Sequence, residues 1–296
     1  MRILLTGGTG FIGSLLLPAL RERGHELLVL TRGEHADTDG CRFVRSLDAI
    51  PPTQRIDAVI NLAGASLAER RWTAAYKREI VDSRLQTTRE LVALCGRLEV
   101  APTVLLSGSA IGYYGHHGDE PLTESADGTP GFARQLCSDW EALALQARDL
   151  GMRVCLLRLG VVLDSGGGAL QQMSGSFRLG VGSWLGSGRQ WLSWVHRRDV
   201  VRAIVFLLEG GGLQGPFNIT APDPVTGRAF CAALEKHHRT LFSAGVPGPL
   251  MRLLVGEMAG ELLLNGQRVV PAALEAAGFR FDYPDIERAL DAIYAG

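Results

Sequence analysis

The stretch Leu4-Leu-Thr-Gly-Gly-Thr-Gly-Phe-Ile-Gly-Ser-Leu-Leu16, LLTGGTGFIGSLL, carries glycines at positions 7, 10 and 13 between an apolar run and an amphipathic segment. Glycines at this spacing between a strand and a helix predict a dinucleotide-binding turn. The first glycine allows the tight turn, the second the approach of a pyrophosphate, and the third close packing of helix on strand. Free N–H groups and the positive dipole end of the helix then face the phosphates. We expect cofactor contacts from Thr6, Gly7, Gly10, Phe11, Ile12 and Gly13.

The end of the second expected strand indicates which dinucleotide is bound. NAD is held by an acidic residue about 20 residues after the glycines, at the ribose 2′-OH. This chain has Thr31 and Arg32 there, and no acidic residue comes before Glu34. A guanidinium suits a 2′-phosphate. The sequence therefore favours NADP(H), bound by Arg32 and Thr31, and the alternative is a surface arginine at the end of a strand.

The string NLAG (61–64) ends the next expected strand at the same edge of the sheet. Small residues there leave room for the ribose and adenine of a cofactor. We expect Leu62, Ala63 and Gly64 to contribute to the cofactor site, and the alternative is a plain turn at the end of a strand.

Apolar runs alternate with amphipathic segments through the first half of the chain, which is typical of strand–helix units in a parallel sheet. Strands are expected at 2–6, 26–31, 57–63, 103–107 and 153–160, and helices at 11–23, 72–96 and 131–150. We predict an α/β fold, a doubly wound parallel (Rossmann) sheet with a smaller C-terminal α/β lobe. The nucleotide-binding domain is expected to comprise 1–160 and a returning segment, 196–220, whose helix is capped by Asp199 and ends at Gly210. The substrate-binding lobe is expected to comprise 161–195 and 221–296.

Composition excludes several classes of function. A net charge of −1 over 296 residues gives no reason to expect nucleic acid or an anionic membrane, and the basic pairs in ERRW and HRRD are interpreted as surface. Five cysteines without a CxxC predict no disulfide framework, and with a His116-His117 pair that lacks further ligands they predict no metal site. A reducing, cytoplasmic location without a membrane span is expected. The helices at 72–96 and 131–150 offer a face for a homodimer.

The strings TGGTGFIG, NLAG, SGSAIGYYG, RLGVVL, WVHRRDVVRA and FNITAPDPVT together resemble the extended short-chain dehydrogenase/reductase superfamily over nearly the whole chain. RRWTAAYKREIVDSR, FARQLCSDWE and GGGAL are similar to its atypical branch, called epimerase family proteins. The resemblance implies a Rossmann fold and an NADP cofactor. In the superfamily, a serine after the central strand polarises the substrate, and Ser109 matches it.

The superfamily also uses a Tyr-x-x-x-Lys pair on the helix expected at 131–141. This chain has Phe132 near the tyrosine position and Leu136 or Cys137 near the lysine. The standard catalytic pair is therefore absent from its helix. Lys77, on the helix after NLAG, is the nearest cation that could stand in for the missing lysine, although its spacing does not support this.

Other side chains could supply the missing proton. Tyr113 and Tyr114 follow Ser109 by four and five residues, and His196 precedes a helix in the second half. A tyrosine without a neighbouring cation keeps a pKa of about 10, so it donates a proton more readily than it removes one. We therefore expect an NADP(H)-dependent oxidoreductase that reduces a small polar carbonyl compound, or oxidises the corresponding hydroxyl compound. The alternatives are a non-catalytic NADPH sensor and a nucleotide-sugar epimerase.

Overall fold

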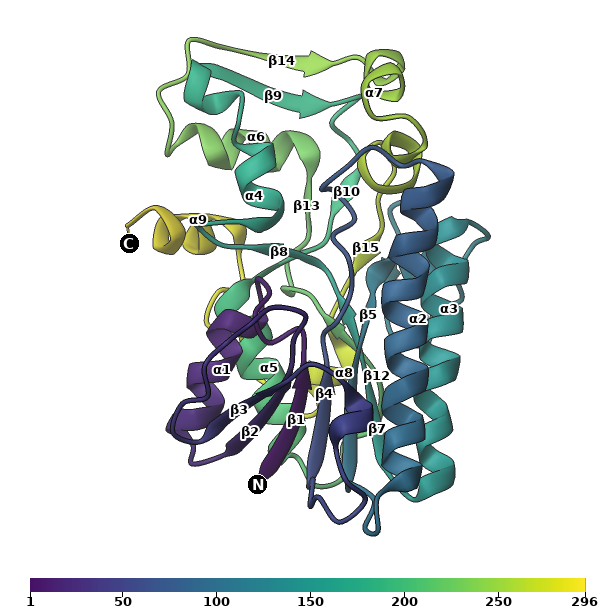
Figure 1. Ribbon diagram of the computed structural model, residues 1–296. Helices are drawn as coiled ribbons and strands as arrows, with labels where there is room; N and C mark the ends of the chain where they lie inside the picture. Colours follow the sequence, from purple (N-terminus) through teal and green to yellow (C-terminus); the bar gives the residue numbers. More distant parts are fainter. Residues whose placement is uncertain (296) are drawn as a thin grey trace.

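A seven-stranded parallel sheet organises the computed structural model, which describes residues 1–295 (Figure 1). The strands lie in the order β12-β7-β5-β4-β1-β2-β3, and every neighbouring pair is parallel. Their bounds are β1 (Arg2–Thr6), β2 (Glu26–Leu30), β3 (Cys41–Val44), β4 (Ala58–Asn61), β5 (Val104–Ala110), β7 (Arg153–Leu159) and β12 (Gly215–Ile219). Both faces of such a sheet must be covered, which is why these strands are apolar almost throughout.

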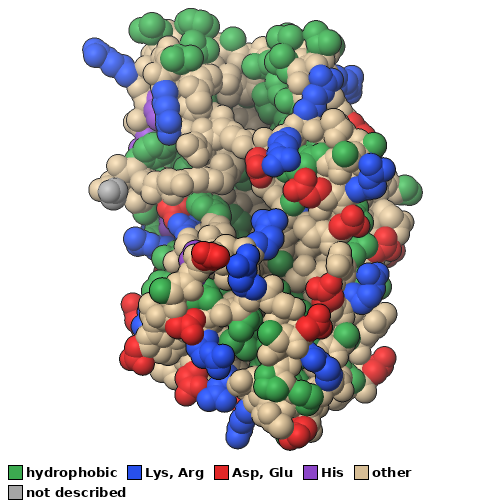
Figure 2. Space-filling view, in the orientation of Figure 1, with side chains coloured by type: hydrophobic (Ala, Val, Ile, Leu, Met, Phe, Trp, Pro, Cys, Tyr) green, Lys and Arg blue, Asp and Glu red, His purple; other side chains and the backbone are tan. Residues whose placement is uncertain are grey.

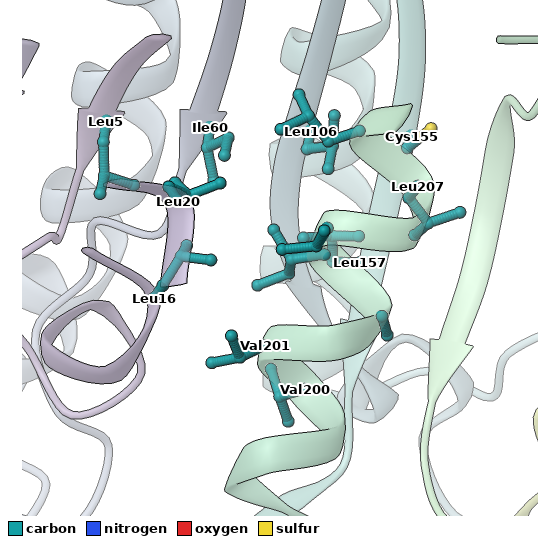
Figure 3. Packing of buried hydrophobic residues seen from close by; sticks show 14 of the residues in the cluster. Leu5, Leu16, Leu20, Ile60, Leu106, Cys155, Leu157, Val200, Val201 and Leu207 are labelled. Atoms are coloured by element: carbon teal, nitrogen blue, oxygen red, sulfur yellow. The ribbon is translucent and has the colours of Figure 1, made fainter. Parts of the chain in front are cut away.

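Helices cover the two faces of the sheet in pairs. On one face α1 (Gly13–Glu22) and α5 (Arg197–Glu209) bury Leu16, Leu20 and Val200 against the strands, as Figure 3 shows. On the other face α2 (Ala74–Arg97) and α3 (Phe132–Leu145) pack Leu91 and Ala144 on a second apolar cluster. Alternate residues of one strand supply the two cores. The predicted doubly wound fold is confirmed.

The direction of winding reverses between β1 and β4. The chain runs outward from β1 to β2 and β3, and from β4 it runs the other way to β5, β7 and β12. Open α/β sheets bind ligands at the carboxyl ends of the strands at such a switch point. The ends of β1 and β4 are paired at Thr6 and Asn61, so the glycine turn and NLAG lie side by side at this edge.

A smaller α/β lobe packs beyond that edge (Figure 1). Its core contains Phe177, Trp194 and Phe230. Its short strands pair as β8 (Val161–Leu163) with β11 (Trp194–His196), β9 (Val181–Leu185) with β14 (Phe242–Val246), and β10 (Trp191–Leu192) with β13 (Val225–Thr226). A further pair, β6 (Pro121–Leu122) with β15 (Arg268–Val269), belongs to a separate small cluster with Tyr114. Its helices are α4 (Gly168–Met173), α6 (Gly227–Glu235), α7 (Gly248–Val255) and α9 (Ile286–Ala295). No helix of residues 1–295 is long and apolar enough to cross a membrane.

Three details differ from the sequence-based expectation. The edge strand β3 was not predicted, because its four residues CRFV carry only a short, half-exposed pattern. Asp199 does not cap α5; His196 does, and the Asp199 carboxylate accepts backbone N–H bonds from Asp282 and Tyr283. The segment around α8 (Ala272–Ala276), expected in the lobe, places Leu274 in the core of the main sheet, where α8 packs on β12.

Candidate cofactor and substrate site

The three positions 7, 10 and 13 of the turn after β1 are glycine for different physical reasons. Gly7 has a φ of +70°, and a Cβ there would lie 2.4 Å from the carbonyl oxygen of Leu62. A Cβ on Gly13 would lie 2.2 Å from the carbonyl oxygen of Gly7, so packing forbids it. Gly10 is different, because the nearest atom to its Cβ would be the same oxygen, at 3.2 Å. The fold thus needs the first and third glycines, while the second leaves space in front of the turn.

The N-terminus of α1 is open to an anion. Its N-cap residue, Ile12, provides no side-chain cap, and the first turn carries no acidic residue. Among the hydrogen bonds of residues 1–295, none satisfies the backbone N–H of Phe11, Ile12 or Gly13. Unpaired N–H groups at the positive end of a helix bind phosphate. The turn can therefore receive a pyrophosphate.

Arg197 closes one side of this turn. Its guanidinium donates to the Ser14 Oγ (2.6 Å) and to an Asp164 carboxylate oxygen (3.2 Å), and it lies 4.5 Å from the centre of the Phe11 ring. The same ring packs against Gly168, which follows the loop after β8. The interpretation of HRRD as a surface pair is wrong for Arg197, whose side chain is only 14% exposed. Sequence reasoning missed it because the partners come from three distant segments.

The end of β2 presents the group expected to select the cofactor. Arg32 is exposed, and no hydrogen bond or ion pair holds it within the part of the chain that is described. Thr31 is buried, and its Oγ1 accepts the backbone N–H of Gly33 (3.2 Å). Glu34, the next acidic residue, pairs with Arg45. A free cation, without a competing carboxylate, therefore lies where an adenosine ribose would end.

The ends of β1 and β4 are joined by buried side chains. The Thr6 hydroxyl donates to Asn61 Oδ1 (2.6 Å) and accepts the backbone N–H of Ala63 (3.2 Å). Asn61 donates in turn to Thr88 Oγ1 on α2 (2.8 Å), and the Leu62 N–H bonds the Thr6 carbonyl. The Thr6 hydroxyl and the N–H groups of Leu62 and Ala63 are thus used within the protein. These three residues shape the cofactor edge, and these particular groups do not face a ligand as free donors.

Ser109, at the end of β5, belongs to a buried ionic cluster. Its hydroxyl donates to Glu141 Oε1 of α3 (2.6 Å), and the serine is 1% exposed. Glu141 binds Arg158 of β7 through two bonds of 2.9 Å, and both of these side chains are buried. The hydroxyl expected to polarise a substrate therefore already has a charged partner inside the protein.

The two tyrosines of SGSAIGYYG lie in different environments, on the short 3-10 turn η2 (Ile111–Tyr114). Tyr114 is fully buried, donates to Asn218 Oδ1 (2.7 Å) and accepts from Arg158 (3.0 Å). Burial raises its pKa although Arg158 opposes the shift. This geometry does not support Tyr114 as a proton donor to a substrate. Tyr113 is half-buried between the guanidiniums of Arg158 and Arg134, at 3.4 and 3.8 Å from its ring centre, and its hydroxyl has no partner within residues 1–295.

His196 also has a structural position. It is 2% exposed, its Nδ1 accepts the backbone N–H of Arg198 (3.1 Å) as the N-cap of α5, and its ring stacks on Tyr283 with 3.8 Å between centroids. Burial lowers its pKa, so the neutral ring that can accept this bond is favoured. The expected role as an acid facing the substrate is not supported.

Helix α3 provides neither an acid nor a cation where the standard pair would lie. Leu136 and Cys137 are buried, and burial raises the pKa of the Cys137 thiol to about 11. Phe132 lies 4.6 Å below the ammonium of Lys77, which is paired with Glu257 (2.9 Å). No group of three or more potential metal ligands occurs among the residues described. Figure 2 shows this side of the molecule hollowed between the upper lobe and the sheet, with basic side chains at the rim.

A doubly wound sheet with a glycine turn and open N–H groups at its switch point is the architecture of dinucleotide-binding α/β proteins. The chain belongs to the NAD dependent epimerase/dehydratase family, whose model matches residues 3–220, and a domain of unknown function (DUF1731) matches residues 246–293. This confirms the resemblance found in the sequence.

Relatives match over their full length. An epimerase family protein of Mycobacterium bovis is 39% identical over 97% of this chain and 96% of its own, and one of Staphylococcus aureus is 37% identical over 97% of both. The crystal structure of human epimerase family protein SDR39U1 (isoform 2) with NADPH superposes with a TM-score of 0.89 at 32% identity, covering all of both chains. The fold and the family are thereby established together.

Proposed function

We propose that the protein is an NADP(H)-dependent oxidoreductase that reduces a small polar carbonyl compound in the hollow between the sheet and the lobe. The observation that supports NADP(H) as the cofactor is the free Arg32 guanidinium at the end of β2. It lies at the same edge of the sheet as the open glycine turn, and no acidic residue competes with a phosphate there. The structure of the human relative with NADPH supports the same choice. Five free, buried cysteines are compatible with the reducing, cytoplasmic location that we propose.

Reduction needs a hydride and a proton. NADPH, when bound, supplies the hydride to the carbonyl carbon. We assign the proton to the Tyr113 hydroxyl, because Tyr114 and His196 are engaged inside the protein and Tyr113 is not. A hydroxyl group can donate its proton to the alkoxide that forms on the carbonyl oxygen. Because the sequence of α3 contains no lysine that could activate this hydroxyl as a base, we favour the reductive direction over a nucleotide-sugar epimerase, which needs an effective base.

Cofactor choice is tested by titrating NADPH and NADH into the wild-type protein and Arg32→Met, using fluorescence of the reduced nicotinamide. We expect the wild type to bind NADPH at least about tenfold more tightly, because a charge-assisted bond to a phosphate contributes about 1.5–3 kcal/mol. R32M should reduce this preference, and Arg89→Met, on the exposed face of α2, should leave it unchanged. Equal wild-type affinities for the two cofactors would remove Arg32 from this role.

A second function is favoured by specific contacts. Ser109 is bonded to Glu141, Tyr114 is buried, and α3 carries no Tyr-x-x-x-Lys pair, which together fit a non-catalytic NADPH sensor. Oxidation of NADPH with a panel of small aldehydes and ketones separates the two functions. Turnover that falls in Tyr113→Phe supports the oxidoreductase, whereas tight binding without oxidation of NADPH supports the sensor.

Self-association remains a proposal. The helices α2 and α3 pack together at one side of the sheet, and we propose that their outward faces form a homodimer. The outward face of α2 is polar, with Arg78, Glu79 and Asp82 along a shallow groove, so such a contact would depend on charge. Sedimentation at low and high salt tests this, since a charged interface weakens as salt is added.

A further inference from the structure

Arg84 of α2 is a desolvated cation without a counter-ion. No carboxylate lies within ion-pair distance of it in the part of the chain that is described. Its one hydrogen bond runs from Nη1 to the carbonyl oxygen of Ile80 (3.0 Å), one turn earlier on the same helix. Burial lowers the pKa of its guanidinium. A partly buried charge without an ionic partner is costly, so the position calls for a ligand that supplies oxygen atoms.

The guanidinium lies at the carboxyl edge of the sheet. A Cβ built on Gly64, just after β4, would be 2.9 Å from Arg84 Cζ and 3.1 and 3.2 Å from its Nη2 and Nε. The group also lies 5.4 Å from the centre of the Trp140 ring, and that ring packs on Gly108 of β5. Arg84 therefore reaches from α2 to the ends of β4 and β5.

The order of the strands fixes which part of a dinucleotide reaches this point. Arg32 marks the end of β2, and the open N–H groups of α1 follow β1. With the strands in the order β2-β1-β4-β5, an adenosine end at β2 and a pyrophosphate at β1 direct the remaining half over β4 and β5. Arg84 lies beside that path.

Two other cations of α2 and α3 contact different groups. Lys77 pairs with Glu257 and lies over Phe132. Arg134, the one basic residue in the sequence of α3, lies over the ring of Tyr113, and its Nη1 makes no hydrogen bond within residues 1–295. Nε and Nη2 of Arg84 make no hydrogen bond within residues 1–295.

We propose that Arg84 binds the nicotinamide-side ribose of the dinucleotide, with Nε and Nη2 donating to its hydroxyl oxygens. The proposal rests on the proposed NADP(H) cofactor. Arg84 would thus provide, from α2, the cation that the superfamily's lysine provides from the helix corresponding to α3. The planar guanidinium presents two adjacent donors, which suits a pair of neighbouring hydroxyl groups.

The test compares two ligands that share the adenosine half. NADPH and adenosine 2′,5′-bisphosphate are titrated into the wild type, Arg84→Met, Arg84→Lys and the control Arg89→Met, by fluorescence and calorimetry. Arg89 lies on the exposed face of the same helix. We expect R84M to weaken NADPH about 10- to 100-fold, with R84K intermediate, and to leave the bisphosphate within about twofold. R89M should change neither affinity.

Each outcome decides the proposal. An R84M variant that binds NADPH as the wild type does would overturn it. An equal loss for both ligands would overturn it too, since Arg84 would then act through the fold; a far-ultraviolet circular dichroism spectrum recorded without ligand checks this directly. If the wild type binds NADPH no more tightly than the bisphosphate, the role of Arg84 is refuted and the proposed cofactor is not. A wild type that binds neither ligand overturns the proposed function as well.

Discussion

Replacing Arg158 with methionine should remove a large part of the stability of the protein. Arg158 makes two bonds with Glu141, one with Tyr114 and one with the carbonyl oxygen of Glu124 (3.1 Å), and its side chain is 4% exposed. Burial alone lowers the pKa of Arg158, but the hydrogen bond and charge of Glu141 outweigh it and raise the pKa above its ordinary value. Breaking a buried pair by removing one partner costs about 3–5 kcal/mol, because the other charge stays buried. That is a large fraction of the ~5–15 kcal/mol that stabilises a folded domain.

A double variant separates lost contacts from the unpaired charge. In Arg158→Met the Glu141 carboxylate is left without a cation, whereas in R158M/E141Q the amide carries no charge and still accepts the Ser109 hydroxyl. We therefore expect R158M/E141Q to be more stable than R158M by about 1–2 kcal/mol, although it carries an additional substitution. The matched control is Arg2→Met, which breaks an ion pair with Glu26 whose side chains are 39% and 62% exposed and should cost less than about 1 kcal/mol.

The assay is equilibrium unfolding in urea at neutral pH, followed by circular dichroism and tryptophan fluorescence. Coincident transitions show whether one free energy of unfolding describes each variant. The reasoning is refuted if R158M is no more costly than R2M. It also fails if the glutamine gives no recovery in the R158M background, because the buried carboxylate would then not be the source of the loss.

Four further substitutions separate fold from function. Gly13→Ala should lower the free energy of unfolding, measured in urea, by about 3 kcal/mol or more, because its Cβ would lie 2.2 Å from a backbone atom. Gly10→Ala places its Cβ 3.2 Å from the nearest atom and should keep the stability of the wild type. Its affinity for NADPH, measured by titration, should fall at least about tenfold. Tyr114→Phe should lower the free energy of unfolding by about 1–3 kcal/mol, because Asn218 and a guanidinium N–H lose their partner, and NADPH binding should not change. A variant with full stability that no longer oxidises NADPH would instead identify Tyr114 as the proton donor. The folded-state pKa of His196 is lowered, so wild-type stability should fall as pH drops through the unfolded-state value of about 6.5 towards the lower folded-state pKa. His196→Asn, which keeps a cap, should flatten that fall, with a residual slope from two other histidines whose pKa is also lowered. An unchanged slope would show that His196 does not titrate differently in the two states.

Most strands of the sheet could be predicted from the sequence, because buried parallel strands are continuous apolar runs. The strands predicted at 2–6, 26–31 and 153–160 agree with the structure to within a residue at each end. β3 was not predicted, because an edge strand of four residues with one buried, one exposed and two partly buried positions has no such signal. Leu274 was assigned to the wrong part of the molecule for another reason: only the packing of α8 on β12 tells which core it joins.

In the candidate site, too, only the features that depend on neighbouring residues could be predicted from the sequence. The roles of Gly7 and Gly13 could be read from spacing, since they depend on backbone geometry within one strand–turn–helix unit. Hydroxyl and imidazole groups could not be assigned in this way, because Tyr114 and His196 owe their positions to Asn218 and Tyr283, about a hundred residues away. Short-range pattern therefore identifies the glycine turn, and it says little about which nearby polar groups remain free for chemistry.

Charge placement shows how the chain keeps its fold without a Tyr-x-x-x-Lys pair on α3. In the described chain, the space behind Ser109 is filled by Glu141 and Arg158, which satisfy one another and anchor β5, β7 and α3 together. A lysine introduced at Leu136 or Cys137 would be a cation in a buried position, at a cost in desolvation. Burial thus makes a lysine at these positions unfavourable, and a cation that reaches the nicotinamide half comes more readily from another element, as Arg84 does from α2.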